Sequence, residues 1–541
     1  MKRSPANGLA AQLAGSNLSR RGLLKTTAAA SGALALGGAQ RSFTAAQDGG
    51  GVAIYASPID IPNIDPAIGH DGAISMTQKH LYDTLYRHLG ADSALTPWLA
   101  TGHEVSEDAT VWTFTLDPSA TFKDGSPVTA DAVVYSTQRI IELNQGVAWM
   151  FAGILDPENV VAVDDQTVQF TLNQPFAPFL HAVTWIFVLN PAEVEANTVD
   201  DDSGQAWLVG NSAGSGPFTI ARWEPGNLYE FTADPDYWKG WESPHVDGYI
   251  HQISAESSTK RIALQSGEIQ FAEWLSPQDK MVLANQPGVV VPLDPSITTY
   301  TLKLNNQVGP TADVNVRRAI SYAFDYDAMI DVMNGFGTRI AGPLSPALTG
   351  AIQEPVYQTD IEKAKEELAK SEEWADGFDI DFVWVTGLEE ERQTGLILAD
   401  QLSQLGINVN VVGMEWANAV ALFADPETSP AIFPIYSGSD YPDADNFLWQ
   451  SFHSSSAGTW TGASHYNNPE VDALLEEGRT TTDEAARIEI YNQVQNIVID
   501  EAVEVYLTTP LEAIPHREEV VGYVYTPVMG SSPWFYDISL A

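Results

Sequence analysis

The stretch from Ile380 to Val412 limits the fold more than any other part of this 541-residue sequence. An apolar run at Ile380–Val385 is typical of a buried strand, a helix is expected at Leu396–Leu405, and a second strand is expected at Ile407–Val412. Two strands separated by one helix usually pair in parallel, because the helix carries the chain back along the sheet. We therefore expect an α/β lobe in the C-terminal half.

The N-terminal half has a different pattern. Alternating apolar and polar residues at Val111–Leu116 and Thr167–Leu172 predict two strands, and Thr129 is placed to cap a helix between them. Apolar residues at helical spacing predict another helix at Ile74–Leu89. Because 541 residues exceed the length at which one core stops growing, we expect two or three lobes. The sequence has no internal repeat, so the lobes differ, and a ligand is expected between them.

A loop with three carboxylates, Asp440, Asp443 and Asp445, follows an apolar, strand-like run. Counted from Asp443, a calcium-binding loop needs Gly at its sixth position and Glu at its twelfth. The chain has Leu448 and Ser454 there, which excludes that type of calcium site.

A carboxylate on a rigid turn beside aromatic residues is suited to pairing with a ligand's ammonium group inside a cleft. The alternative is a turn whose Asp and Asn side chains cap backbone groups while the other acids face water. The ten histidines have no metal-ligand spacing, and we expect His453 and His465 at the surface. Aromatic cleft walls are expected from Trp384, Trp416, Trp460 and Tyr441. The candidate ligand-binding residues are Gly438, Ser439, Asp440, Tyr441, Trp384 and Trp416.

Residues 1–46 are typical of an export signal. A pair of arginines, Arg20 and Arg21, precedes Lys25 and a mildly apolar stretch rich in Ala and Gly. This is the twin-arginine pattern, which directs folded proteins out of the cytoplasm. Cleavage is expected after Ala39 or Ala46, and the mature protein is expected in the periplasm.

Charge and cysteine content exclude several classes of partner. A net charge of -45 argues against nucleic acid or anionic membrane surfaces. The chain has no cysteine, so disulfides, thiolate metal ligands and a cysteine-linked lipid anchor are excluded. We expect no cofactor, no metal and no membrane insertion.

Several motifs occur in the same order as in a known family. From about Val52 to Pro527 the chain resembles the periplasmic dipeptide- and oligopeptide-binding proteins of ABC importers, the family 5 solute-binding proteins. The segments that carry the resemblance are Leu81–Tyr86, Pro97–Ala100, Glu104–Asp108, Phe122–Gly125, Val128–Asp131, Gly214–Phe218, Asp236–Trp238, Val316–Ile320 and Asp440–Asn446.

The resemblance implies an α/β fold of the type II periplasmic binding protein kind. Such proteins have two lobes joined by a two-strand hinge, an extra α+β domain in the N-terminal lobe, and a cleft that closes on the ligand. Applied to this sequence, the resemblance implies that lobe I comprises 48–92, 206–297 and 503–541, that the extra domain is 93–205, and that lobe II is 298–502. The hinge crossings are expected near Ser296–Thr301 and Glu501–Tyr506.

In dipeptide-binding members an Asp of the corresponding loop pairs with the ligand's ammonium group, and Asp440 matches that position. The resemblance also implies that Asp443, Asp445 and Asn446 maintain the loop. Such proteins hold the ligand carboxylate with an Arg in the loop after the strand that matches Ile380–Val385. Here that loop is rich in Glu, and Arg392 is expected to begin a helix, which argues against a dipeptide with a free carboxylate.

The predicted function is capture of a di- or oligopeptide and its delivery, as a monomer, to an ABC permease and ATPase. A cationic or amine compound, an opine or an oligosaccharide on the same scaffold remains an alternative. A chaperone or sensor on this scaffold and a secreted hydrolase with two catalytic carboxylates are more distant alternatives. No nucleophile motif supports catalysis, so we expect no enzyme activity.

Overall fold

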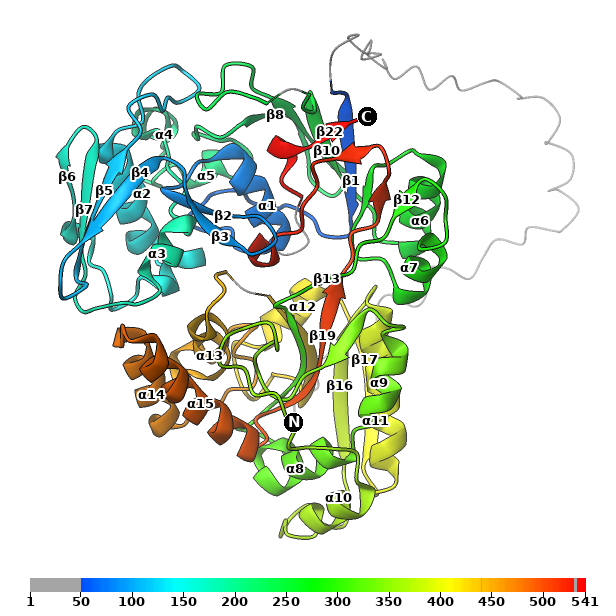
Figure 1. Ribbon diagram of the computed structural model, residues 1–541. Helices are drawn as coiled ribbons and strands as arrows, with labels where there is room; N and C mark the ends of the chain where they lie inside the picture. The colour runs from blue at the N-terminus through cyan, green and yellow to red at the C-terminus, as the bar shows by residue number, and fades with distance from the viewer. Residues whose placement is uncertain (1–49, 243, 439, 530–532) are drawn as a thin grey trace, which may run out of the picture. The chain divides into compact units, whose positions relative to one another are not determined.

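The structure is a computed structural model that describes residues 50–242, 244–438, 440–529 and 533–541. The expected export signal and Ser439 lie outside these residues. Within them, the strands form two seven-stranded sheets, one four-stranded sheet and two two-stranded ribbons (Figure 1).

The first large sheet is mixed and contains both early and late segments of the chain. β1 at its centre pairs in parallel with β10 and β11, and the other pairings are antiparallel. Its strands, in spatial order, are β12 (Val289–Val290), β20 (His516–Arg517), β11 (Phe271–Ala272), β1 (Val52–Ser57), β10 (Gly248–Ile253), β9 (Leu228–Ala233) and β8 (Phe218–Glu224).

The second large sheet contains the strand, helix and strand expected from the sequence. β16 and β17 pair in parallel, and α11 between them in sequence packs on both (Figure 1). The parallel α/β prediction is therefore confirmed. The strands are β13 (Asp294–Pro295), β19 (Glu504–Glu512), β14 (Thr299–Leu304), β18 (Ile432–Ser437), β16 (Asp379–Val385) and β17 (Asn408–Met414), with β15 (Gly337–Arg339) paired to β19.

The four-stranded sheet is antiparallel and contains both alternating segments of the N-terminal half. Its order is β4 (Ala100–Val105), β5 (Val111–Leu116), β7 (Thr167–Thr171) and β6 (Val160–Asp164). The ribbons pair β2 (Tyr86–Leu89) with β3 (Ala94–Pro97), and β21 (Val520–Val521) with β22 (Ser539–Leu540).

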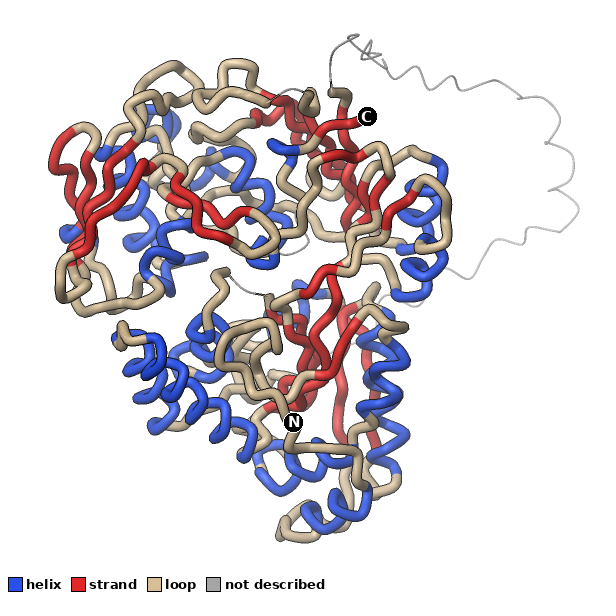
Figure 2. The backbone as a smooth tube through the Cα atoms, in the orientation of Figure 1, coloured by secondary structure: helices blue, strands red, loops and turns tan. Residues whose placement is uncertain are grey.

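Helices lie beside the strands of both large sheets (Figure 2). The α-helices are α1 (Gly72–Leu81), α2 (Ala130–Leu143), α3 (Phe179–Ala182), α4 (Pro191–Asn197), α5 (Gln205–Leu208), α6 (Ser257–Ser266), α7 (Pro277–Leu283), α8 (Val314–Ala323), α9 (Tyr326–Val332), α10 (Ile361–Leu368), α11 (Glu389–Ser403), α12 (Trp416–Leu422), α13 (Ala444–Phe452), α14 (Pro469–Thr480) and α15 (Glu484–Asp500).

The helix expected to run to Leu89 ends at Leu81, so that part of the prediction is wrong. Tyr82 is extended, and the chain enters β2 at Tyr86. The buried carboxylate of Asp83 accepts hydrogen bonds from Arg87, from the indole of Trp98 and from other donors. Arg87 is local, but Ser215, Tyr237 and Trp238 come from a distant segment, so tertiary contacts outweigh the local helical spacing.

The chain passes between the two large sheets at two places in the described residues. The first crossing lies between β12 and β13, at 291–293, a few residues before the expected Ser296–Thr301. Residues 504–512 form β19, which pairs with β14 and β13, so the second crossing comes after Glu512 and not at Glu501–Tyr506. The paired strands β13 and β19 thus lie where the chain changes sheet.

Candidate functional site

The loop between β18 and α13 presents the carboxylate of Asp440. Asp443 caps α13 by accepting from the backbone N–H of Asp445. The backbone N–H of Asp440 donates to the side-chain oxygen of Asn446 at 3.2 Å, and Gln450 Nε2 donates to Asp440 Oδ2 at 3.1 Å. The loop is therefore fixed at both ends, and one oxygen of Asp440 already has a neutral donor.

Two residues from the N-terminal half contact Asp440. His70 Nε2 lies 2.8 Å from Asp440 Oδ1, and their side chains are 16% and 13% exposed. The indole N–H of Trp185 donates to the main-chain oxygen of Asp440 at 2.7 Å. Burial lowers the pKa of His70, but the neighbouring Asp440 carboxylate outweighs burial, and the net pKa of His70 lies above its usual value. Asp440 thus favours the protonated, cationic form of His70.

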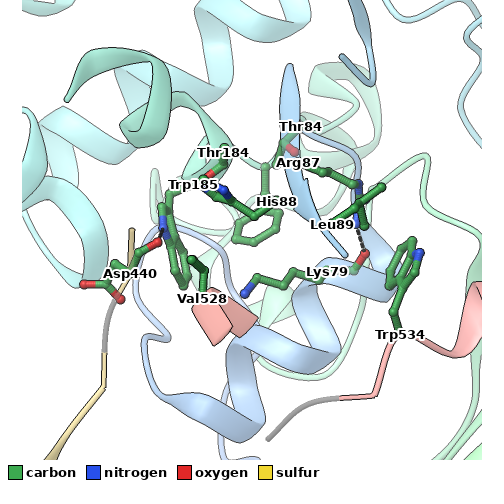
Figure 3. Close-up of a pocket in the computed structure, with 11 residues that line it drawn as sticks. Lys79, Thr84, Arg87, His88, Leu89, Thr184, Trp185, Asp440, Val528 and Trp534 are labelled. Carbon is green, nitrogen blue, oxygen red and sulfur yellow. Dashed lines mark hydrogen bonds between the residues drawn. The ribbon is translucent and has the colours of Figure 1, made fainter. Parts of the chain in front are cut away.

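Asp440 also borders a cavity of about 20 Å³ (Figure 3). Such a volume has room for about one water molecule, so a ligand enters only if these walls separate. Lys79 projects into the cavity, with its Nζ 4.8 Å from the ring centroid of Trp185. Burial lowers the pKa of Lys79 to about 8, while the Asp440 carboxylate acts in the opposite direction. The other lining residues are Thr84, Arg87, His88, Leu89, Thr184, Phe187, Val528 and Trp534.

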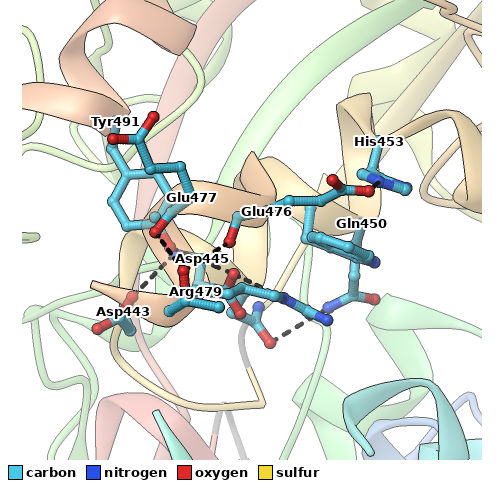
Figure 4. Close-up of polar contacts among 12 residues, drawn as sticks. Asp443, Asp445, Gln450, His453, Glu476, Glu477, Arg479 and Tyr491 are labelled. Atoms are coloured by element: carbon cyan, nitrogen blue, oxygen red, sulfur yellow. Dashed lines mark hydrogen bonds and ion pairs between the residues drawn. The ribbon is translucent and has the colours of Figure 1, made fainter. Parts of the chain in front are cut away.

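A buried polar network lies beneath the loop (Figure 4). Arg479 Nε donates to Asp445 at 2.9 Å, and its guanidinium lies 3.5 Å from the ring centroid of Trp449. The hydroxyl of Tyr441 donates to the other oxygen of Asp445 at 2.5 Å. Two nitrogens of Arg487 donate to Asp443 at 2.8 and 2.9 Å. These contacts agree with the prediction that Asp443, Asp445 and Asn446 maintain the loop.

The remaining candidates lie in different surroundings. The side chain of Tyr441 is fully buried and lies within 6.3 Å of the rings of Trp149 and His181, measured between ring centroids. Trp416 is 42% exposed, 6.1 Å from Trp460 between ring centroids, and Trp384 is half-buried against the core of the second sheet. A Cβ atom added at Gly438 would have no neighbour within 4 Å, so close packing does not require glycine there.

The surface placement expected for two histidines is wrong. His465 is 4% exposed, and the side chain of His453 is 10% exposed and stacks on Trp449 at 3.7 Å between ring centroids. Among the described residues, no group of three or more His, Asp or Glu side chains is arranged to hold a metal ion.

Sequence reasoning missed His70, Lys79 and Trp185. His70 precedes α1 and Lys79 lies in its last turn, whereas Trp185 comes from a distant segment. None belongs to a local motif that marks a site. The one available signal was the run Asp65-Pro66-Ala67-Ile68-Gly69-His70, because a loop that precedes a helix is a common position for binding residues.

Comparison with known proteins places this architecture in a family. The family model described as "Bacterial extracellular solute-binding proteins, family 5 Middle" matches residues 94–459. The "Probable D,D-dipeptide-binding periplasmic protein DdpA" of Escherichia coli (strain K12) is 33% identical over 441 residues, covering 80% of this chain and 82% of that protein. Heme-binding protein A of Haemophilus influenzae is 29% identical over 502 residues, covering 88% and 90%.

A solved structure shares the fold. It is the ABC transporter-associated periplasmic binding protein DppA from Helicobacter pylori in complex with peptide STSA. The TM-score is 0.81 at 24% identity, with 91% of this chain and 98% of that chain covered. The expected α/β periplasmic-binding-protein fold is therefore confirmed.

No helix within the described ranges is long and apolar enough to cross a bilayer.

The family model covers more than half of the chain, and the similarity to the relatives extends over most of it. The chain therefore belongs to the family 5 bacterial extracellular solute-binding proteins, a family of non-enzymatic proteins that bind solutes for ABC importers.

Proposed function

We propose that this protein captures peptides in a cleft between its lobes and delivers them to an ABC permease and ATPase. The ligand's ammonium group pairs with Asp440. The observation that carries the proposal is the placement of the Asp440 carboxylate at the wall of a cavity lined by segments of both halves of the chain, 2.8 Å from His70 Nε2.

The chemistry of Asp440 supports an amine-bearing ligand. A partly buried carboxylate that accepts charge-assisted hydrogen bonds favours ammonium over neutral groups. Backbone groups of the loop add hydrogen bonds that do not depend on ligand side chains. We therefore assign ligand contact to Asp440 and to the backbone of Gly438, Ser439 and Tyr441, with Trp384 and Trp416 as aromatic contacts.

The proposed division of the chain into lobes is based on the arrangement that the family resemblance implies. Lobe I comprises 48–92, 206–297 and 513–541, the extra domain is 93–205, and lobe II is 298–512. The last boundary is moved from the expected 502 because β19 pairs within the second large sheet. Residues 1–46 direct export by the twin-arginine route, and the mature protein acts in the periplasm as a monomer without a lipid anchor.

Two measurements test the function. Native mass spectrometry of the purified protein reveals a co-purified solute, and a peptide is expected. Calorimetry then compares the wild type with Asp440→Asn, and we expect the variant to lose about 2–5 kcal/mol of binding free energy for an amine-bearing peptide. Unchanged affinity excludes Asp440 as the ammonium partner. A solute without an amine, such as an oligosaccharide, excludes the peptide assignment.

A further inference from the structure

The ammonium group of Lys79 has no hydrogen-bond or ion-pair partner among the residues that the structure describes. Lys79 lies in the last turn of α1, and Figure 3 shows its amine pointing into the cavity that Asp440 also borders. Within the described residues, its ammonium group lies 4.8 Å from the ring centroid of Trp185, and the Asp440 carboxylate acts on it electrostatically without forming an ion pair. An ammonium group has three donors, and a partly buried cation is stabilised by an acceptor.

The neighbouring cation, Arg87, already has hydrogen-bond and ion-pair partners within the protein. Its guanidinium donates to the carboxylate of Asp83 and to the main-chain oxygens of Lys79 and Tyr82. It also lies within 4.9 Å of the ring centroids of two tryptophans. Lys79, in contrast, has donors to offer an anion in the cavity.

The loop that follows β16 offers no comparable donor. Arg392, in the first turn of α11, is paired with Glu389 through two nitrogens at 2.6 and 2.8 Å. Its side chain is 41% exposed, so it remains largely in water. A ligand carboxylate therefore finds a better partner on α1 than beside β16.

We propose that Lys79 Nζ binds the carboxylate of a short zwitterionic peptide whose ammonium group is held by Asp440. This assignment rests on the function proposed for Asp440 and narrows its ligand class. Lys79 and Asp440 border one cavity of about 20 Å³ but form no ion pair with each other within the described residues. A ligand that satisfies both groups carries its two charges close together, as a dipeptide does and a long peptide does not.

The experiment uses the mature protein and defined dipeptides. A mixture of free-acid dipeptides is screened by native mass spectrometry, and the one retained best is measured by calorimetry beside its C-terminal amide and its N-acetyl form. We expect amidation to weaken binding to the wild type roughly 10- to 100-fold, because a charge-assisted hydrogen bond is lost. In Lys79→Met, which keeps an unbranched apolar stem beside Trp185, we expect amidation to have no further effect.

Two variants serve as controls. Lys79→Arg keeps a cation and is expected to retain the preference for the free acid. Lys365→Met removes an exposed lysine of α10 that pairs with Glu362, and it is expected to bind like the wild type.

The possible outcomes separate the two proposals. If N-acetylation abolishes binding but amidation has the same effect in the wild type and in Lys79→Met, the role of Lys79 is refuted and that of Asp440 stands. If N-acetylation has no effect, the role of Asp440 is refuted, and the role of Lys79 that rests on it is refuted too. Failure to retain any free-acid dipeptide overturns the assignment to Lys79.

Discussion

His70 Nε2 and Asp440 Oδ1 lie 2.8 Å apart, although 370 positions separate the two residues in sequence. The His70 ring therefore occupies the place that the ammonium group of the proposed ligand would take. Besides Asp440, the charged groups near this imidazole are Asp71 and Lys79.

The first prediction concerns the pH dependence of binding. Because Asp440 raises the pKa of His70, the ion pair is present below that pKa and is lost as the pH rises through it. The ligand competes with the ion pair, so affinity for an amine-bearing peptide is expected to increase from pH 5.5 to pH 7.5. Calorimetry at several pH values measures this increase.

His70→Gln is the matched variant, because it keeps a hydrogen-bonding side chain without the charge. Its affinity is expected to vary much less with pH over the same range. An identical increase in the wild type and in His70→Gln would show that another group is responsible.

The second prediction concerns alkaline pH. With a pKa of about 8, Lys79 loses its charge as the pH rises further, so affinity for a free-acid dipeptide is expected to fall. The peptide's own ammonium group titrates in the same region, so the wild type is compared with Lys79→Arg. The guanidinium remains charged, and a smaller decrease in that variant isolates the contribution of Lys79. Equal decreases would exclude it.

The third prediction concerns the support of the loop. Arg479 and Asp445 form a fully buried pair, so Arg479→Met leaves a buried carboxylate without its cationic partner and is expected to cost about 3–5 kcal/mol of folding free energy. Adding Asp445→Asn is expected to restore part of this loss. Urea denaturation of the single and double variants measures both effects.

The control is Arg222→Met, which removes an exposed pair with Glu224. Its expected effect on folding free energy is below about 1 kcal/mol. A cost for Arg479→Met that is no greater than this would refute the structural role of the buried pair.

The fourth prediction concerns acid stability. Burial lowers the pKa of His80 and His88 to about 3 and that of His251 to about 4. Below about pH 6.5 these rings are protonated in the unfolded chain but remain neutral in the folded protein. Each ring therefore lowers the free energy of unfolding by about 1.4 kcal/mol for every unit by which the pH falls between 6.5 and its folded pKa.

His251→Phe tests this contribution, since a phenyl ring fits between Tyr55 and Tyr229 without titrating. The slope of stability against pH between 6.5 and 4.5 is expected to be smaller in the variant. Urea midpoints over that range give the slope, and parallel curves for the two proteins would contradict the prediction.

Local patterns in the sequence predicted much of the fold. The parallel strands β16 and β17 follow from apolar runs with a helix between them, and the paired strands β5 and β7 follow from alternating apolar and polar residues. The helix end at Leu81 was not predictable from spacing, because the chain turns there around the buried Asp83, most of whose partners come from other segments.

The site was predictable only in part. The loop motif singled out Asp440, but its contacts with His70 and Trp185, and the cavity that it shares with Lys79, form only when distant segments fold together. Tyr441 illustrates the same limit. An aromatic residue beside an acid suggested a cleft wall, whereas its ring is buried beside Trp149 and His181.

The indole N–H of Trp185 donates a hydrogen bond to the main-chain oxygen of residue 440, a group that every amino acid possesses. Replacing the Asp440 side chain therefore leaves this link between distant segments in place. The charge of the side chain at position 440 can thus change without loss of the hydrogen bond that holds the loop against Trp185. A protein built this way can acquire a preference for a differently charged ligand and keep the contact between its two halves.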